Sequence, residues 1–104
     1  LVEVTYITDE SCEDCYNVNV HKTVLTNYGV YTAEETTVDI SSEQGQALRE
    51  KYNITKVPTM IASEELQYYK TINEIWEKVG TIEDDGTYVF RDLDLVSEKY
   101  TTLE

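Results

Sequence analysis

The sequence predicts a single α/β domain in which short strands alternate with helices. Two segments rich in β-branched residues, 2–8 and 34–40, have the composition of strands. Each is followed by a segment with helical spacing of its apolar residues, 15–28 and 41–53. Strands that alternate with helices pair in parallel through right-handed crossovers, so we expect the first two strands to be parallel neighbours.

The ends of these two helices carry specific signals. Gly29 follows the first helix and can act as its C-cap. Ser41 and Gln44 have the spacing of a capping box at the start of the second helix. Asn53 is suited to the left-handed conformation that often ends a helix. The helical spacing of the first helix is visible from Cys15 onwards.

The second half of the chain predicts further elements of both kinds. A proline in mid-strand removes a ladder donor, so Pro58 should open the strand expected over 57–63. Residues 66–69 are expected to return as a short hairpin arm. Apolar spacing over 72–79 predicts the clearest helix of the chain, and an Asp-Gly pair between alternating segments predicts a hairpin over 81–90.

The two ends of the chain differ from the rest. After Arg91 the sequence becomes acidic and irregular, which predicts a domain over 1–90 and a loose acidic tail over 91–104. The chain opens with Leu1 instead of Met and closes with Leu103-Glu104, a pair that often remains from a cloning site before a purification tag. We therefore expect a monomeric fragment of a longer protein.

Composition excludes several classes of partner. The chain of 104 residues has 21 acidic and 8 basic residues, for a net charge of −13. Phosphates of nucleic acids and anionic membrane surfaces both require clustered Lys and Arg, so neither is an expected partner. No apolar run approaches the ~18 residues of a membrane span, and no signal peptide is visible. We expect a soluble domain, whose compartment the sequence leaves open as cytoplasmic or extracytoplasmic.

The stretch "SCEDC" carries the chemistry. Cys12 and Cys15 are the only cysteines, and a C-x-x-C pair can be a redox couple, half of a metal site or two idle thiols. The first cysteine is expected to close a strand-to-helix loop and the second to lie one turn into the helix. Unpaired amides at a helix N-terminus stabilise a thiolate, so the outer thiol would be the nucleophile. The pair would be close enough to form a disulfide.

A metal site is the weaker alternative. Structural zinc needs about four ligands, and the two cysteines leave His21 and carboxylates to complete the set. His21 lies on another part of its helix, so it cannot easily face the same ion, and it falls within the apolar arc. We expect His21 to be a packed, hydrogen-bonded residue, and we expect no metal and no cofactor.

The cysteine motif and a second segment together carry a family resemblance. "SCEDC" after the strand "VEVTYIT", with "KYNITKVPT" at 51–59, resembles a thioredoxin-like domain over roughly residues 2–66. The resemblance implies a central mixed sheet of about four strands flanked by helices. It also implies that Pro58 is cis and packs against the cysteines. Because the chain begins so near the motif, this would be a minimal version that lacks the family's first strand and helix.

The resemblance also implies an activity, thiol–disulfide exchange. Cys12 would attack a protein disulfide or thiol partner, and Cys15 would resolve the mixed disulfide. Pro58 would shape a groove, and the backbone of Val57 or Thr59 would pair with an extended substrate segment.

Two departures from the family keep a second hypothesis open. Ser11 replaces the aromatic residue that often precedes the first cysteine, and Tyr6 replaces the buried acid that acts in proton transfer. The missing acid and the trimmed ends of the chain support this alternative, a non-catalytic interaction module of a larger protein whose cysteines are structural or regulatory.

Glu13 and Asp14 are expected to modulate Cys12. Acids in the first turn of a helix complement its dipole by about 0.3–1 kcal/mol each. A carboxylate near a thiolate also raises the thiol pKa, which opposes the pull of the helix. We expect a Cys12 pKa only mildly below ~8.5 and a comparatively reducing couple.

Overall fold

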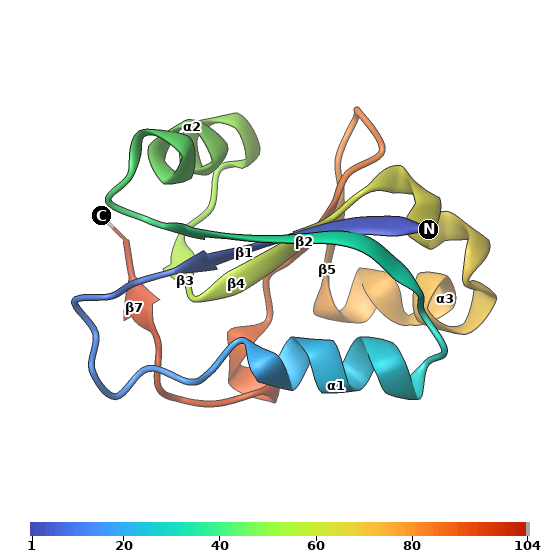
Figure 1. The fold of residues 1–104 in the computed structure, drawn as a ribbon, viewed down its shortest axis with the longest axis horizontal. Helices are drawn as coiled ribbons and strands as arrows, with labels where there is room; N and C mark the ends of the chain where they lie inside the picture. The colour runs from blue at the N-terminus through green and yellow to red at the C-terminus, as the bar shows by residue number, and fades with distance from the viewer. Residues whose placement is uncertain (104) are drawn as a thin grey trace.

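A five-stranded sheet with helices on both faces forms the body of the molecule (Figure 1). The structure is a computed structural model and describes residues 1–103. The strands lie in the order β2-β1-β4-β6-β5, and a separate two-stranded sheet joins β3 and β7. The strands are β1 Val2–Thr8, β2 Thr32–Asp39, β3 Lys56–Val57, β4 Thr59–Ala62, β5 Gly80–Ile82, β6 Tyr88–Phe90 and β7 Thr101–Thr102. The helices are α1 Asn19–Asn27, α2 Glu43–Tyr52 and α3 Lys70–Val79, with 3-10 helices at Glu64–Tyr68 and Leu93–Leu95.

The pairing of the strands confirms the expected α/β class. β1 and β2 are parallel along their whole length, as their separation by α1 predicted. β4 is antiparallel to β1, and β6 is antiparallel to both β4 and β5, so the sheet is mixed. The structure has five strands in this sheet where about four were expected.

The core lies on both faces of the sheet, because successive side chains of β1 and β4 point in opposite directions. Val4, Tyr6 and Met60 pack in a larger cluster with α1 and α3. Ile7 and Ile61 pack on the other face in a second cluster, which includes residues of α2. Figure 1 shows this division, with α2 on one side of the sheet and α1 and α3 on the other.

The first helix begins later than expected. α1 begins at Asn19, so Cys15 lies outside it. Two hydrogen bonds, one distant in sequence and one local, explain the delay: the Tyr16 amide donates to the Lys99 carbonyl, and the Asn17 side chain accepts from the Asn19 amide. Backbone groups that bond elsewhere, and an asparagine that bonds its own chain, both compete with helix formation.

The second helix has its cap one residue later than expected. Ser42, not Ser41, is the N-cap, and its hydroxyl accepts from the Gly45 amide. A Cβ atom at Gly45 would lie 2.2 Å from the Asp39 carbonyl oxygen, so only glycine fits at this contact between α2 and β2. Asn53 ends α2 with φ of 50°, which confirms the left-handed terminator.

Residues 64 to 82 match the expectations in part. The prediction of a hairpin arm over 66–69 is wrong, because Glu64–Tyr68 form a 3-10 helix in which Leu66 is fully buried. The helix α3 and the hairpin of β5 and β6 are both present.

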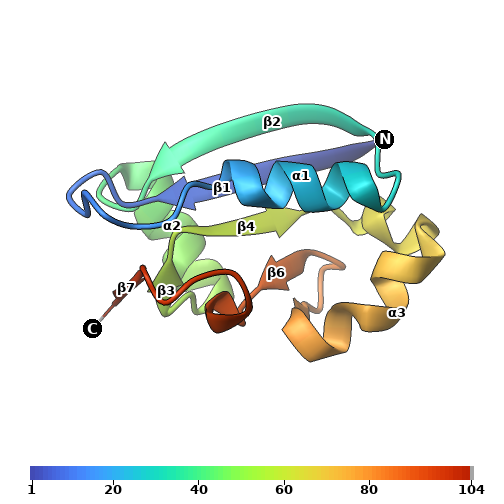
Figure 2. The same cartoon turned by 90° about the horizontal axis from the view of Figure 1, so that it is seen from below.

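The C-terminal residues are not a loose tail. Leu93 is buried in the larger core cluster, and Leu103 packs against the second cluster. β7 pairs antiparallel with β3. Figure 2 shows this segment returning beside β3 at the end of the sheet that carries the loop after β1. Most apolar residues of 91–103 thus dock on the domain despite the acidic composition, whereas Leu95 is exposed. Glu104 lies outside the described residues.

Candidate functional site

The two cysteines form a disulfide in the loop between β1 and α1. The Cα atoms of Cys12 and Cys15 are 5.5 Å apart, and both residues are half-buried. The loop turns tightly because the Cys12 amide donates to the Asp9 carbonyl. The expected pairing of Cys12 with Cys15 is therefore present, in a loop where both cysteines are partly exposed.

The position of α1 removes one of the expected influences on these sulfurs. The helix begins four residues after Cys15, and its first turn contains no acidic residue. Partial charges at a helix end act mainly within its first turn. The helix N-terminus is therefore not positioned to stabilise a Cys12 thiolate, and Glu13 and Asp14 do not complement the dipole of α1 as expected.

Asp14 instead lies directly beside the disulfide. Its Oδ1 atom is 3.7 Å from Cys12 Sγ, and its Oδ2 atom is 3.6 Å from Lys99 Nζ. Both side chains of this ion pair are exposed, at 77% for Asp14 and 65% for Lys99. Asp9 also faces the loop, where hydrogen bonds from Ser11 and Thr101 hold its pKa below the usual range. The side of the site that Asp14 and Lys99 line, its outer side, is therefore acidic and exposed to solvent.

The C-terminal segment forms a second wall of the site. Thr101 Oγ1 lies 3.7 Å from Cys15 Sγ, and the Tyr16 amide donates to the Lys99 carbonyl at 2.9 Å. Thr101 is opposite Val57 in the pairing of β7 with β3. Sequence reasoning missed these residues, because nothing in residues 97–103 marks them as neighbours of a loop more than eighty positions away.

The third wall is the segment around Pro58. The Val57–Pro58 peptide bond is cis. The hydroxyl of Tyr16, the residue after Cys15, donates to the Pro58 carbonyl at 2.8 Å, which ties the cysteine loop to the proline segment. His21 Nε2 lies 2.6 Å from the same hydroxyl. Since the tyrosine gives its single proton to Pro58, the neutral histidine donates from Nε2 to Tyr16.

His21 has the packed position that its place in the sequence predicted. It is 4% exposed and lies edge-on to Phe90 with ring centroids 4.8 Å apart. Burial lowers the pKa of His21 to about 4, so the side chain is neutral at ordinary pH. Burial also raises the pKa of Tyr16 above its usual value, which keeps that hydroxyl protonated.

The three residues predicted to bind a substrate strand are all buried. Val57 is 0% exposed, Pro58 is buried, and the Thr59 hydroxyl donates to the Phe90 carbonyl at 2.6 Å. The backbone of Val57 faces β7. The structure therefore brings Pro58 to the cysteine loop through Tyr16, but the strand edge expected for a substrate is already paired.

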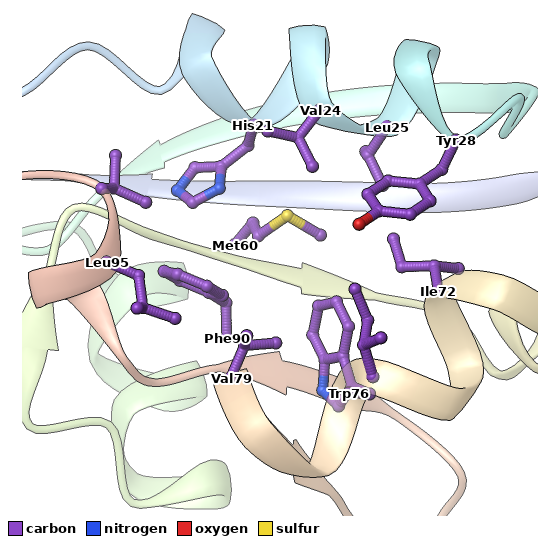
Figure 3. Close-up of a pocket in the computed structure, with 12 residues that line it drawn as sticks. His21, Val24, Leu25, Tyr28, Met60, Ile72, Trp76, Val79, Phe90 and Leu95 are labelled. Carbon is purple, nitrogen blue, oxygen red and sulfur yellow. The ribbon is translucent and has the colours of Figure 1, made fainter.

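A separate apolar cavity of about 220 Å³ lies between α1 and α3. Figure 3 shows His21 and Val24 from α1 on one side, Trp76 from α3 on the other, and Met60 at its floor. None of the residues that we predicted for the site lines this cavity.

Within residues 1–103, no group of three or more His, Cys, Asp and Glu side chains is placed to hold a metal ion. No helix among these residues has the length and apolar character needed to cross a bilayer.

Comparison with known proteins leaves the chain without a match. No family model, no curated protein and no solved structure matches it. The structure itself establishes a small α/β domain with a mixed five-stranded sheet, three helices and a C-x-x-C disulfide. These features fit a thioredoxin-like fold.

Proposed function

We propose that this protein is a thiol–disulfide oxidoreductase with a thioredoxin-like fold. The observation that carries the proposal is the Cys12–Cys15 disulfide in a half-exposed loop that Tyr16 ties to the cis Val57–Pro58 segment. A disulfide that served only to staple the fold would close a longer loop, since the loss of chain entropy in the unfolded state grows with loop length. This bond closes a loop with only two intervening residues, so it constrains little of the chain.

The proposed reaction is a reversible exchange of two electrons. A partner thiolate attacks Cys12 Sγ, a bond forms between the two sulfurs, and the Cys12–Cys15 bond breaks with its electron pair on Cys15. A second partner thiolate then attacks the partner sulfur of the mixed disulfide and releases Cys12. The partner dithiol is oxidised to a disulfide, Cys12 and Cys15 are reduced, and the released thiolates take up protons from water. The reverse sequence reduces a partner disulfide.

The neighbours of the two sulfurs support this assignment of roles. The mixed disulfide on Cys12 requires a thiolate on Cys15, and the Thr101 hydroxyl at 3.7 Å can donate to it by turning its single proton away from Asp9. Asp14 opposes a negative charge on Cys12. A destabilised Cys12 thiolate makes the reduced form less favourable, so the couple should be comparatively reducing.

The experiment is exchange with a model partner. The oxidised protein is incubated with glutathione buffers, and free thiols are counted after acid quenching. We expect two thiols to appear and disappear together as the buffer is varied. Cys15→Ser should accumulate a mixed disulfide through Cys12, whereas Cys12→Ser should accumulate much less. A disulfide that stays closed across the range of buffers, in folded protein, would contradict the proposal.

The second candidate is a non-catalytic interaction module. It is favoured by the contact of Cys15 with Thr101 and by the pairing of β7 with β3, because both couple the disulfide to the docking of the C-terminal segment. Catalysed reduction of a protein disulfide, such as insulin, by dithiothreitol separates the two candidates. An oxidoreductase accelerates the reaction with turnover, and a module of this kind does not.

A further inference from the structure

The edge of β3 is occupied by the chain's own C-terminal segment. Lys56 lies opposite Thr102 and Val57 opposite Thr101, in an antiparallel pair that is separate from the main sheet. The Leu103 amide extends the pairing by donating to the Thr55 carbonyl at 2.7 Å. Added strands of this kind are how many proteins hold an extended peptide, with backbone bonds for affinity and alternate side chains for specificity.

Four side chains of this segment make distinct contacts with the rest of the domain. Lys99 pairs with Asp14 at 3.6 Å, and Thr101 lies against Cys15. The Tyr100 ring lies under Lys56 Nζ at 5.1 Å from the ring centroid. Leu103 packs against the second core cluster. The segment thus presents a cation, an aromatic ring, a hydroxyl and an aliphatic side chain to the cysteine loop and β3.

The attachment is of a kind that can open without unfolding the domain. The ladder has two residues in each strand, and an isolated two-stranded pair of this size is not stable by itself. The Lys99–Asp14 pair is exposed on both sides, where ion pairs contribute little. Segments with few buried contacts open by local fluctuation at a lower cost than the core.

We propose that residues 97–103 occupy, from within the same chain, the edge of β3 at which the family resemblance places an extended substrate, and that they compete with that substrate for the edge. The partner should resemble the occupant: a basic residue for Asp14, then an aromatic residue, then a small residue beside Cys15. The net charge of −13 favours such a basic partner over an acidic one. The inference deepens the proposed function by naming its substrate class, and the C-terminal segment must leave before a partner strand reaches Val57.

The test uses the protein of residues 1–104 and a fluorescein-labelled synthetic peptide with the sequence SEKYTTL, which contains no thiol. In the release variant, Lys99→Glu reverses the ion pair and Leu103→Pro removes the amide that donates to Thr55. The control variant combines Lys70→Glu, at an exposed pair far along the sequence, with Thr102→Pro. Neighbouring residues of an antiparallel strand alternate in bonding, so the Thr102 amide points away from β3.

We expect the release variant to bind the peptide at least about tenfold more tightly than the wild type or the control, as measured by fluorescence anisotropy. A peptide with glutamate in place of its lysine should bind the release variant more weakly. Equal binding by all three proteins, or no binding by a folded release variant, would overturn the inference.

A second measurement does not depend on the variants. In wild-type protein, excess unlabelled peptide should displace the C-terminal segment and speed hydrogen exchange at the Leu103 amide, while the amides of β1 keep their rates. An unchanged Leu103 rate at saturating peptide contradicts the inference. Peptide binding requires no redox step, so its failure leaves the exchange chemistry of Cys12 and Cys15 standing, and failed exchange leaves the binding result standing.

Discussion

Polar groups lie on both sides of the Cys12–Cys15 disulfide, but they are exposed to solvent on one side and buried on the other. On the outer side, Asp14 and Lys99 meet in water, with most of each side chain exposed. On the inner side, His21, Tyr16 and the Pro58 carbonyl form a hydrogen-bonded chain under the loop, with His21 almost completely buried.

The difference between these surroundings decides what each side can do. An exposed ion pair is screened and adds about 0–1 kcal/mol, so the outer side can adjust the charge on a sulfur but cannot hold the loop. A buried group that loses its partner costs about 1–3 kcal/mol, so the inner side fixes the loop against Pro58. Changes on the inner side should therefore alter stability, and changes on the outer side should alter chemistry.

The largest effect expected is the acid sensitivity of the inner side. His21 is the only histidine, and its pKa of about 4 in the folded protein lies below the ~6.5 of an unfolded chain. The unfolded state therefore binds more protons between these values, and the free energy of unfolding falls as pH drops through them. The slope should approach about 1.4 kcal/mol per pH unit, for a total near 3 kcal/mol. Urea unfolding at half-unit steps of pH measures it.

His21→Gln is the control for this acid sensitivity, because its amide can still donate to Tyr16 without titrating. We expect a nearly flat profile in this variant from pH 6.5 to 4.5. Hydrogen bonds from Ser11, Ser41 and Tyr52 lower the pKa values of Asp9, Asp39 and Asp85, respectively. The stability that these carboxylates contribute to the protein is therefore lost only as pH falls below about 4. An unchanged slope in His21→Gln would assign the effect to other groups.

The second prediction removes the hydroxyl between His21 and Pro58. Tyr16→Phe keeps the ring and leaves the His21 N–H and the Pro58 carbonyl without their shared partner. We expect a loss of about 1–3 kcal/mol in the free energy of unfolding, measured in urea at pH 7. Tyr100→Phe is the matched control, since the Tyr100 hydroxyl donates to the exposed carboxylate of Asp94. A loss no larger than in the control would mean that the buried chain of hydrogen bonds adds nothing.

The sequence could predict the parts of this site that depend on local pattern. β1 and β2 have β-branched residues, α3 has helical apolar spacing, and His21 falls on an apolar arc, so each was placed correctly. The spacing of Cys12 and Cys15, together with their place after a predicted strand, predicted their disulfide. These features need only the properties of neighbouring residues.

The parts that the sequence could not predict depend on contacts between distant segments. α1 begins at Asn19 because the Tyr16 amide bonds to Lys99, a residue that acidic composition had assigned to a loose tail. Thr101 beside Cys15 has no signal in its own neighbourhood. The hydroxyl of Tyr16 could not be placed before its two partners were known.

The third prediction concerns the hydroxyl that lies beside Cys15. Thr101→Val keeps the shape of the side chain and removes the donor that would stabilise a Cys15 thiolate. We expect the mixed disulfide on Cys12 to form several-fold more slowly. The effect should be smaller than the loss of a full hydrogen bond to a charged group, because the Thr101 proton is shared between Cys15 and Asp9. Stopped-flow mixing with a small thiol measures this rate. Thr102→Val, on the neighbouring exposed residue, should leave the rate unchanged, and equal rates in all three proteins would remove Thr101 from the chemistry.

The smallest effect belongs to the acids of the outer side. In the disulfide form, Asp14 Oδ1 lies 3.7 Å from Cys12 Sγ, so after reduction we expect Asp14 to repel a charge on Cys12, whereas Glu13 is exposed beside it. Asp14→Asn should let Cys12 ionise at a pH lower by a few tenths of a unit and make the couple slightly more oxidising, since exposed charges are screened. Thiolate absorbance against pH and equilibrium with glutathione measure the two quantities.

Glu13→Gln removes the same charge from a neighbouring position and should have a smaller effect. High salt should shrink both differences, because screening weakens a charge effect but not a packing effect. If Asp14→Asn and Glu13→Gln have equal effects, the short distance to Asp14 is irrelevant and only the net charge of the loop acts on Cys12. If neither has any effect, the acids do not modulate the thiols at all.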